Sequence, residues 1–167
     1  MSELNSLHDL FVEQLQDLYD AEQRLTKALP EMIEAAHCGD LKQALQAHLE
    51  ETERQIERLE HVFEEIGETA EAKTCQAMKG LIAEGEEVIK AKGNAEVRDA
   101  ALIAAAQRVE HYEIAGYGTC RAFAQRLGFE RAAEMLQETL DEESGADRKL
   151  TEIAEQTVNA EAQQAEK

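Results

Sequence analysis

The chain has no tryptophan and a single proline, and aromatic residues make up only 4% of it. Aromatic and β-branched residues are those that strands favour, and no segment alternates in the manner of a strand. Alanine, glutamate, leucine and glutamine dominate instead, and these residues enter helices at little cost in free energy. The sequence therefore predicts an all-α fold.

Long apolar runs are also missing. No uninterrupted stretch approaches the roughly 20 residues of a membrane-spanning helix, and residues 1–8 lack the basic and apolar segments of a signal peptide. The three cysteines, Cys38, Cys75 and Cys120, lie far apart and form no Cys-x-x-Cys motif. We therefore expect a cytoplasmic protein with reduced thiols and no membrane partner.

Positive charge is scarce beside negative charge. The chain has 17 lysines and arginines against 36 acidic residues, which gives a formal net charge of -19 at pH 7. Such a charge repels the phosphates of nucleic acids, so we expect no nucleic-acid partner. It is compatible with attraction of metal cations, although most of these acids are expected to solvate helix surfaces.

Apolar residues recur at helical spacing in four long segments and a shorter one. The helices that this spacing predicts are 6–37, 40–66, 74–90, 94–127 and 130–154. Two long helices, a crossing connection and two more long helices indicate a ferritin-like four-helix bundle, with the short helix in the crossover between helices two and three. We expect one domain over residues 1–167.

Several residues mark the expected helix boundaries. Pro30 should kink the first helix or divide it. Asp40 and Gln43 resemble a capping box that opens the second helix, and Asn94 is expected to cap the 94–127 helix. The tail from about 156 is polar and expected to fray.

Polar side chains interrupt the apolar stripe of each long helix. In the first helix, Glu22 lies in the three-and-four series that also holds Leu18 and Leu25. The stripes of the other three helices carry the remaining candidates, which are His48, Glu51, Gln55, Glu110, Glu113, Glu143 and Asp147.

Acids on all four inner faces need a common compensation, because burying an unpaired carboxylate costs several kcal/mol. They cannot pair with one another, since they share a sign. A pair of divalent cations would compensate them, and oxygen-rich ligands with one or two imidazoles suit iron or manganese. The sequence therefore predicts a dinuclear metal centre inside the bundle.

Other interpretations of these residues stay open at this point. With 36 acids in the chain, any one of them can fall on a stripe by chance, and Glu22 alone could be exposed. For His48 and Gln55, a satisfied polar role in the core competes with metal ligation. His111 lies beside the stripe of the 94–127 helix, so we expect it to hydrogen-bond to a ligand.

Five runs resemble the YciE/YciF family of ferritin-like proteins. They are LYDAE at 18–22, HLEET at 48–52, CQAMKGL at 75–81, RDAALIAAAQRVEHYEIAGYGT at 98–119 and ETLDEE at 138–143. The resemblance covers nearly the whole chain. It implies a bundle related to rubrerythrins, often dimeric, and associated with bacterial stress responses.

The resemblance also implies ligands. Rubrerythrin-type sites use a Glu-x-x-Glu pair on the third helix, which Glu110 and Glu113 match, and a first-helix glutamate, which Glu22 matches.

The second and fourth helices depart from the pattern, because such sites usually carry Glu-x-x-His there. Glu51 is followed at that spacing by Arg54, and Glu143 by Ala146. In place of the two histidines, the fourth helix offers Asp147 one position further on, and the second helix offers Gln55. This loss puts oxidase or peroxidase chemistry in doubt and leaves metal binding in place.

The leading hypothesis is a cytoplasmic, homodimeric, ferritin-like protein that binds two ions of iron or manganese and can react with oxygen or peroxide. The predicted ligands are Glu22, His48, Glu51, Glu110, Glu113, Glu143 and Asp147. Two alternatives are a non-catalytic dimeric stress protein that acts through a protein partner, and iron storage in a many-subunit shell.

Overall fold

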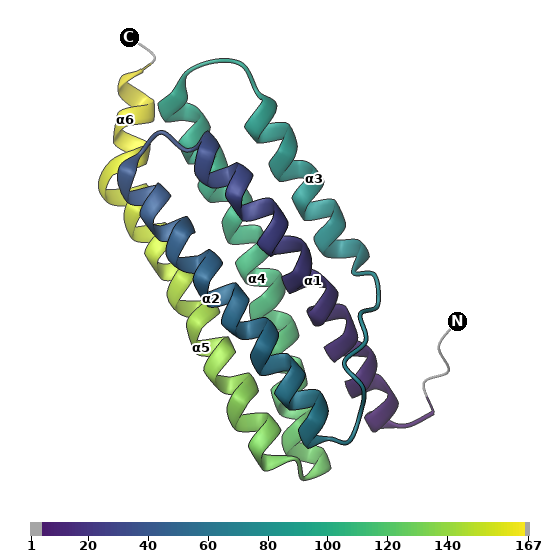
Figure 1. Ribbon diagram of the computed structural model, residues 1–167. Coiled ribbons are helices and arrows are strands. Elements are labelled where there is room, and N and C mark those ends of the chain that lie inside the picture. The colour runs from purple at the N-terminus through teal and green to yellow at the C-terminus, as the bar shows by residue number, and fades with distance from the viewer. Residues whose placement is uncertain (1–4, 166–167) are drawn as a thin grey trace.

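The computed structural model describes residues 5–165. Within them it contains six α-helices, one π-helical turn and no strand, which confirms the predicted all-α class (Figure 1). The elements are α1 (Leu7–Ala35), α2 (Gly39–Glu65), α3 (Gln76–Lys90), α4 (Ala95–Leu127), α5 (Glu130–Ile153), the π-helical turn η1 (Ala154–Val158) and α6 (Asn159–Gln164). None of the described helices has the length and hydropathy needed to cross a membrane.

Four long helices, α1, α2, α4 and α5, form the bundle. Neighbouring pairs in the bundle are α1 with α2, α2 with α5, α4 with α5 and α1 with α4. The chain leaves α2, runs back along the bundle and enters α3, which packs against α1 and α4 on the outside (Figure 1). The predicted four-helix bundle with an extra helix in the crossover is therefore confirmed.

Local signals set some of the helix ends as expected. The Asn94 side chain accepts hydrogen bonds from the backbone N–H groups of Glu96 and Val97, which caps α4. Gly128 ends α4 with a φ of 83°, a left-handed conformation that glycine adopts without steric strain.

The predicted capping box at Asp40 and Gln43 is wrong. α2 begins at Gly39, so Asp40 lies inside its first turn, and within the described chain the Cys38 side chain makes no capping hydrogen bond. Asp99 of α4 instead fixes the two residues that precede α2, because its carboxylate accepts hydrogen bonds from the backbone N–H groups of His37 at 2.8 Å and Cys38 at 2.6 Å. A tertiary contact therefore holds the chain at the start of α2.

Two further expectations differ from the structure. Of the two outcomes expected at Pro30, a kink or a division of the helix, the division does not occur, because α1 runs without a break to Ala35. Pro30 faces solvent, so water can bond the carbonyl group that its missing N–H leaves free. The tail does not fray before Gln164, because η1 and α6 pack on α4 and bury Val158 to 1% exposure.

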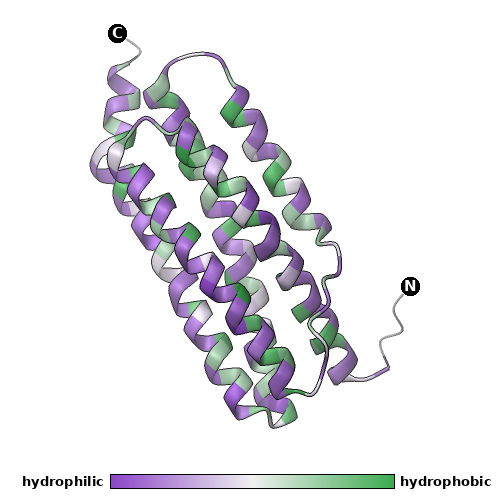
Figure 2. Cartoon of the chain, viewed as in Figure 1, coloured by the Kyte–Doolittle hydropathy of each residue, from purple (hydrophilic) through white to green (hydrophobic). Residues whose placement is uncertain are grey.

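Two apolar clusters fill the bundle, and each long helix enters both. The first cluster includes Leu25, Leu29, Leu41, Leu45, Leu102, Ile103, Leu150 and Ile153. The second includes Phe11, Leu15, Leu18, Leu59, Val62, Tyr117, Leu136 and Ala132. Figure 2 shows apolar and hydrophilic residues interspersed along every helix, as is typical of the amphipathic helices of a bundle. The two clusters therefore meet midway along the bundle.

Candidate metal centre

Five ionisable side chains lie buried where the two apolar clusters meet. Each long helix contributes, because each carries a polar residue between its segments in the two clusters. The five are Glu22 of α1, His48 of α2, Glu110 and Glu113 of α4, and Glu143 of α5. Three of these glutamates, Glu22, Glu113 and Glu143, are 0% exposed, although glutamate is seldom buried without a partner.

Four of the five side chains converge on one point. His48, Glu110, Glu113 and Glu143 each offer one ligand atom, and these atoms all lie within 4.8 Å of one another. His48 Nε2 lies 3.3 Å from Glu110 Oε1 and 4.0 Å from Glu143 Oε2. The structure thus brings together ligands that sequence analysis took from three separate helices.

Most polar atoms of this group have no hydrogen-bond partner among the described residues. They are Glu22 Oε2, both ring nitrogens of His48, Glu110 Oε2, and both carboxylate oxygens of Glu113 and Glu143. A single buried polar group without a partner costs about 1–3 kcal/mol. So many together form a group of atoms that a cation could satisfy.

The carboxylates also oppose each other's ionisation. Burial is the largest cause that raises the pKa of Glu22, Glu110 and Glu113 well above the usual glutamate range. The negative charge of Glu143 raises all three pKa values further. Without a cation, this centre is therefore a destabilising element of the fold.

Tyr117 supports Glu22 from the neighbouring helix. Its hydroxyl donates a hydrogen bond to Glu22 Oε1, which leaves Glu22 Oε2 for another partner. Burial, followed by the negative charges of Glu22 and Glu113, raises the pKa of Tyr117 well above its usual value. Tyr117 therefore stays protonated and keeps donating to Glu22.

Glu51, a predicted ligand, lies at the edge of the centre. Its side chain is 32% exposed, and its Oε2 atom lies 3.7 Å from His48 Nδ1. Burial alone would lower the pKa of His48, but the nearby carboxylates of Glu51 and Glu143 outweigh burial and raise it. Glu51 is not among the four converging residues.

Asp147, another predicted ligand, lies one helical turn from Glu143 and outside the converging group. Its Oδ1 atom accepts a hydrogen bond from Gln107 Nε2 at 3.0 Å and lies 3.3 Å from His111 Nε2. His111 is 68% exposed at its side chain, and Asp147 is its neighbour in this interaction. The indirect role expected for His111 therefore stays a prediction, which depends on whether Asp147 binds metal.

Gln55 is buried beside the centre, but its amide group turns to Glu142. Gln55 Nε2 donates to Glu142 Oε2 at 3.0 Å, and Arg58 donates to both oxygens of the same carboxylate at 2.8 and 3.0 Å. Burial would raise the pKa of Glu142, but Arg58 and Gln55 lower it on balance. Sequence analysis missed the Arg58–Glu142 ion pair. The only signal for it was the opposite charge of two residues that lie beside the apolar stripes of α2 and α5.

The donor set fits a hard or borderline divalent cation. It consists of several carboxylate oxygens and one imidazole, the combination that suits iron and manganese, and no thiolate. The four converging residues lie on helices with apolar clusters on both sides of them, which limits the access of water. The class of protein is therefore an all-helical bundle with a buried carboxylate-and-histidine centre able to hold metal.

Comparison with known proteins gives the family. A family model described as "Domain of unknown function (DUF892)" matches residues 6–163, and the chain belongs to this family. It is 49% identical to Protein YciF of Escherichia coli (strain K12) over 161 residues, which cover 96% of this chain and 97% of YciF. The resemblance inferred from the five sequence runs is thus confirmed.

Solved structures agree with the fold. The crystal structure of the E. coli stress protein YciF matches with a TM-score of 0.90, over 93% of this chain and 98% of that one. YcfI of Rhodopseudomonas palustris matches with a TM-score of 0.87 at 46% identity, over 89% and 95% of the two chains. A protein of Xanthomonas campestris pv. campestris, 21% identical, shares the fold with a TM-score of 0.75 over 93% and 95%.

Proposed function

We propose that this chain is a ferritin-like, metal-binding protein that holds two ions of iron or manganese at the middle of its bundle. We also propose that it serves in a stress response, since its relative YciF is described as a stress protein. The observation that supports it most is the group of buried ligand atoms without hydrogen-bond partners among the described residues. Buried carboxylates are tolerated in a fold when a cation compensates their charge and occupies their free oxygen atoms.

Charge balance favours two ions over one. Four buried glutamates, Glu22, Glu110, Glu113 and Glu143, bring four negative charges when ionised. Two divalent cations neutralise these charges, whereas one cation leaves two in excess. His48 would add a neutral nitrogen ligand, and the proton that its raised pKa holds would leave when metal binds.

The residues of this chain would hold the ions and orient the ligands. Glu110, Glu113, Glu143 and His48 would bind directly, and Glu22, fixed by Tyr117, would complete the set. Bound iron or manganese supplies electron-transfer chemistry toward oxygen or peroxide. Asp147 stays a predicted ligand at the perimeter, and Glu51, whose Oε2 atom lies 3.7 Å from His48 Nδ1, lies outside the set that would bind directly.

A cytoplasmic location is part of the proposal. All three cysteines are free thiols in the described chain, and the pKa of buried Cys120 is raised to about 12, chiefly by burial. Such thiols suit a reducing compartment.

Metal content tests this function. The chain is purified without chelator, loaded anaerobically with ferrous iron or manganese, desalted and measured by plasma mass spectrometry. We expect about two ions per chain, as in other carboxylate bundles. A Glu22→Ala/Glu113→Ala variant should retain helical circular dichroism and lose the metal, whereas Glu134→Ala, at an exposed position of α5, should keep it. No retained metal in the wild-type chain would favour the non-catalytic, partner-dependent alternative.

A further inference from the structure

A pocket of about 500 Å³ lies between α2 and α5 and extends inward to α4. Small residues line it where the two helices face each other, with Ala44 and Ala47 on α2 and Gly145 and Ala146 on α5. Larger side chains at these positions would close the space between the helices. The volume lies within the range of about 300–1,000 Å³ that is usual for ligand sites.

The inner end of this pocket is the buried centre. His48 and Glu110 both line it, although they are only 5% and 2% exposed. Both ring nitrogens of His48 and the Oε2 atom of Glu110 lack a hydrogen-bond partner within residues 5–165. The pocket therefore reaches polar atoms that are available to a ligand.

The outer part of the pocket is acidic. Asp40 and Glu51 line it beside Glu142, whose charge Arg58 already neutralises. Lys149 also lines the pocket, but its ammonium group lies 3.7 Å from Glu152 and is 60% exposed. A cation that enters the pocket thus meets the carboxylates of Asp40 and Glu51.

His48 connects the outer and inner parts. Its Nδ1 atom lies 3.7 Å from Glu51 Oε2, and its Nε2 atom lies 3.3 Å from Glu110 Oε1. One imidazole ring therefore spans the distance between an accessible carboxylate and a buried one.

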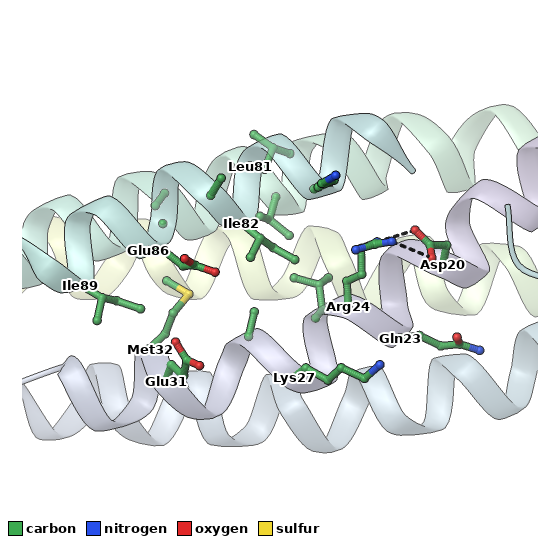
Figure 3. Close-up of a pocket in the computed structure, with 17 residues that line it drawn as sticks. Asp20, Gln23, Arg24, Lys27, Glu31, Met32, Leu81, Ile82, Glu86 and Ile89 are labelled. Atoms are coloured by element: carbon green, nitrogen blue, oxygen red, sulfur yellow. Dashed lines mark hydrogen bonds and ion pairs between the residues drawn. The ribbon is translucent and has the colours of Figure 1, made fainter. Parts of the chain in front are cut away.

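A second large pocket has a different character. It has a volume of about 450 Å³ and lies between α1, α3 and α4 (Figure 3). An Asp20–Arg24 ion pair stands at one end with Lys27 nearby, and Glu31 and Glu86 stand toward the other end (Figure 3). None of the five residues of the buried centre lines it. Only the α2–α5 pocket of the two leads to the ligand atoms.

We propose that the α2–α5 pocket is the path by which a divalent cation reaches the buried centre, with Glu51 as the capture residue and His48 as the side chain that passes the ion inward. This inference rests on the proposed function and adds to it the route and the residues of metal uptake. Glu51 acts on the rate of uptake, and the four converging residues set the final occupancy.

The rate of cobalt(II) uptake tests the path. Mixing the metal-free chain with cobalt(II) in a stopped-flow instrument allows uptake to be followed by cobalt absorbance, and plasma mass spectrometry then gives the final metal content. A cleft lined by charges of one sign raises association rates by about 10- to 1,000-fold. Glu51→Gln should slow uptake at least about tenfold and make the rate less dependent on salt concentration.

A second variant tests the open volume of the α2–α5 pocket rather than its negative charge. Ala146→Leu places a larger helix-forming side chain in the pocket and should slow uptake with wild-type final metal content. Glu53→Gln, on the exposed side of α2, is the matched control and should take up metal at the wild-type rate.

The possible outcomes separate the two proposals. A wild-type chain that binds no cobalt, iron or manganese overturns the proposed function itself. Metal binding with wild-type uptake rates in both Glu51→Gln and Ala146→Leu overturns the path alone. Loss of metal from Glu51→Gln at equilibrium would make Glu51 a ligand and overturn its role in capture.

Discussion

Replacing Glu113 by glutamine should stabilise the metal-free protein and weaken the metal-loaded one. Glu113 is 0% exposed, and neither of its oxygens has a hydrogen-bond partner among the residues described. Burial and the charges of Glu22, Glu143 and Glu110 raise its pKa well above the usual value. Glutamine has nearly the same shape, carries no charge, and its amide group can donate to a neighbouring carboxylate.

The size of the effect follows from the cost of a buried, unpaired charge. Neutral replacement of poorly compensated buried ions stabilises proteins by about 1–4 kcal/mol. For a chain of this length, 1 kcal/mol corresponds to about 2–4 °C in Tm. The metal-free Glu113→Gln variant should therefore melt at least about 2 °C above the wild type at pH 8.

The difference between variant and wild type should depend on pH. The pKa values of Glu22, Glu110 and Glu113 are raised in the folded state, so the folded chain binds more protons than the unfolded chain above the usual glutamate pKa. Stability from these groups is present at low pH and is lost as pH rises through the folded pKa values. Glu143 and His48 are the other two ionisable side chains that face these carboxylates in the centre. The variant should gain most at pH 8 and little near pH 5.

Metal should reverse the order. A metal at 100 times its Kd stabilises the folded state by about 2.7 kcal/mol, and the variant loses much of this because a ligand is gone. Differential scanning calorimetry at pH 5.5 and 8, with chelator and with manganese, measures all four conditions. The exposed Glu134→Gln should behave as wild type throughout. A metal-free variant that melts below wild type at pH 8 would refute the reasoning.

Three further predictions follow from other parts of the fold. A Cβ atom at Gly116 would lie 2.7 Å from Leu18 Cδ2, so Gly116→Ala should destabilise the chain by about 1–2 kcal/mol in urea melts. A Cβ atom at Gly80 would meet open space beyond its own turn of helix, so the contrasting Gly80→Ala should stabilise the chain by about 0.5–1 kcal/mol. Tyr117→Phe removes the donor to Glu22 and should weaken manganese binding about 10–100-fold in anaerobic titrations. Size-exclusion chromatography with light scattering should give a homodimer of 18.6 kDa chains, and a many-subunit shell would instead favour iron storage.

Most of the fold follows from the spacing of apolar residues. The five main helices begin and end within two residues of their predicted bounds, although the predicted capping box at Asp40 is wrong. That error has a physical cause, since Asp99 fixes the residues that precede α2 from 61 positions away and sequence spacing cannot show it. The tail was expected to fray and is helical for a similar reason, since it depends on a tertiary contact. Burial of one residue, Val158, stabilises it although its composition is polar.

The centre was predictable where an acid interrupts an apolar stripe. Glu22, Glu110, Glu113 and Glu143 were found in this way, and each is buried. Whether a neighbour one turn away points inward depends on how the helices pack, so Asp147 could not be distinguished from Glu143 in advance.

The partners of the ligands were harder to predict from the sequence. Tyr117 lies on the stripe of α4, but its bond to Glu22 depends on the distance between α1 and α4. The Arg58–Glu142 ion pair likewise depends on how α2 faces α5.

Anomalous X-ray diffraction from manganese-loaded crystals tests the central claim most directly. The claim predicts strong anomalous peaks inside the bundle, within coordination distance of Glu110, Glu113, Glu143 and His48, with one peak also beside Glu22. Peaks confined to surface carboxylates, with no density between these side chains, would contradict it.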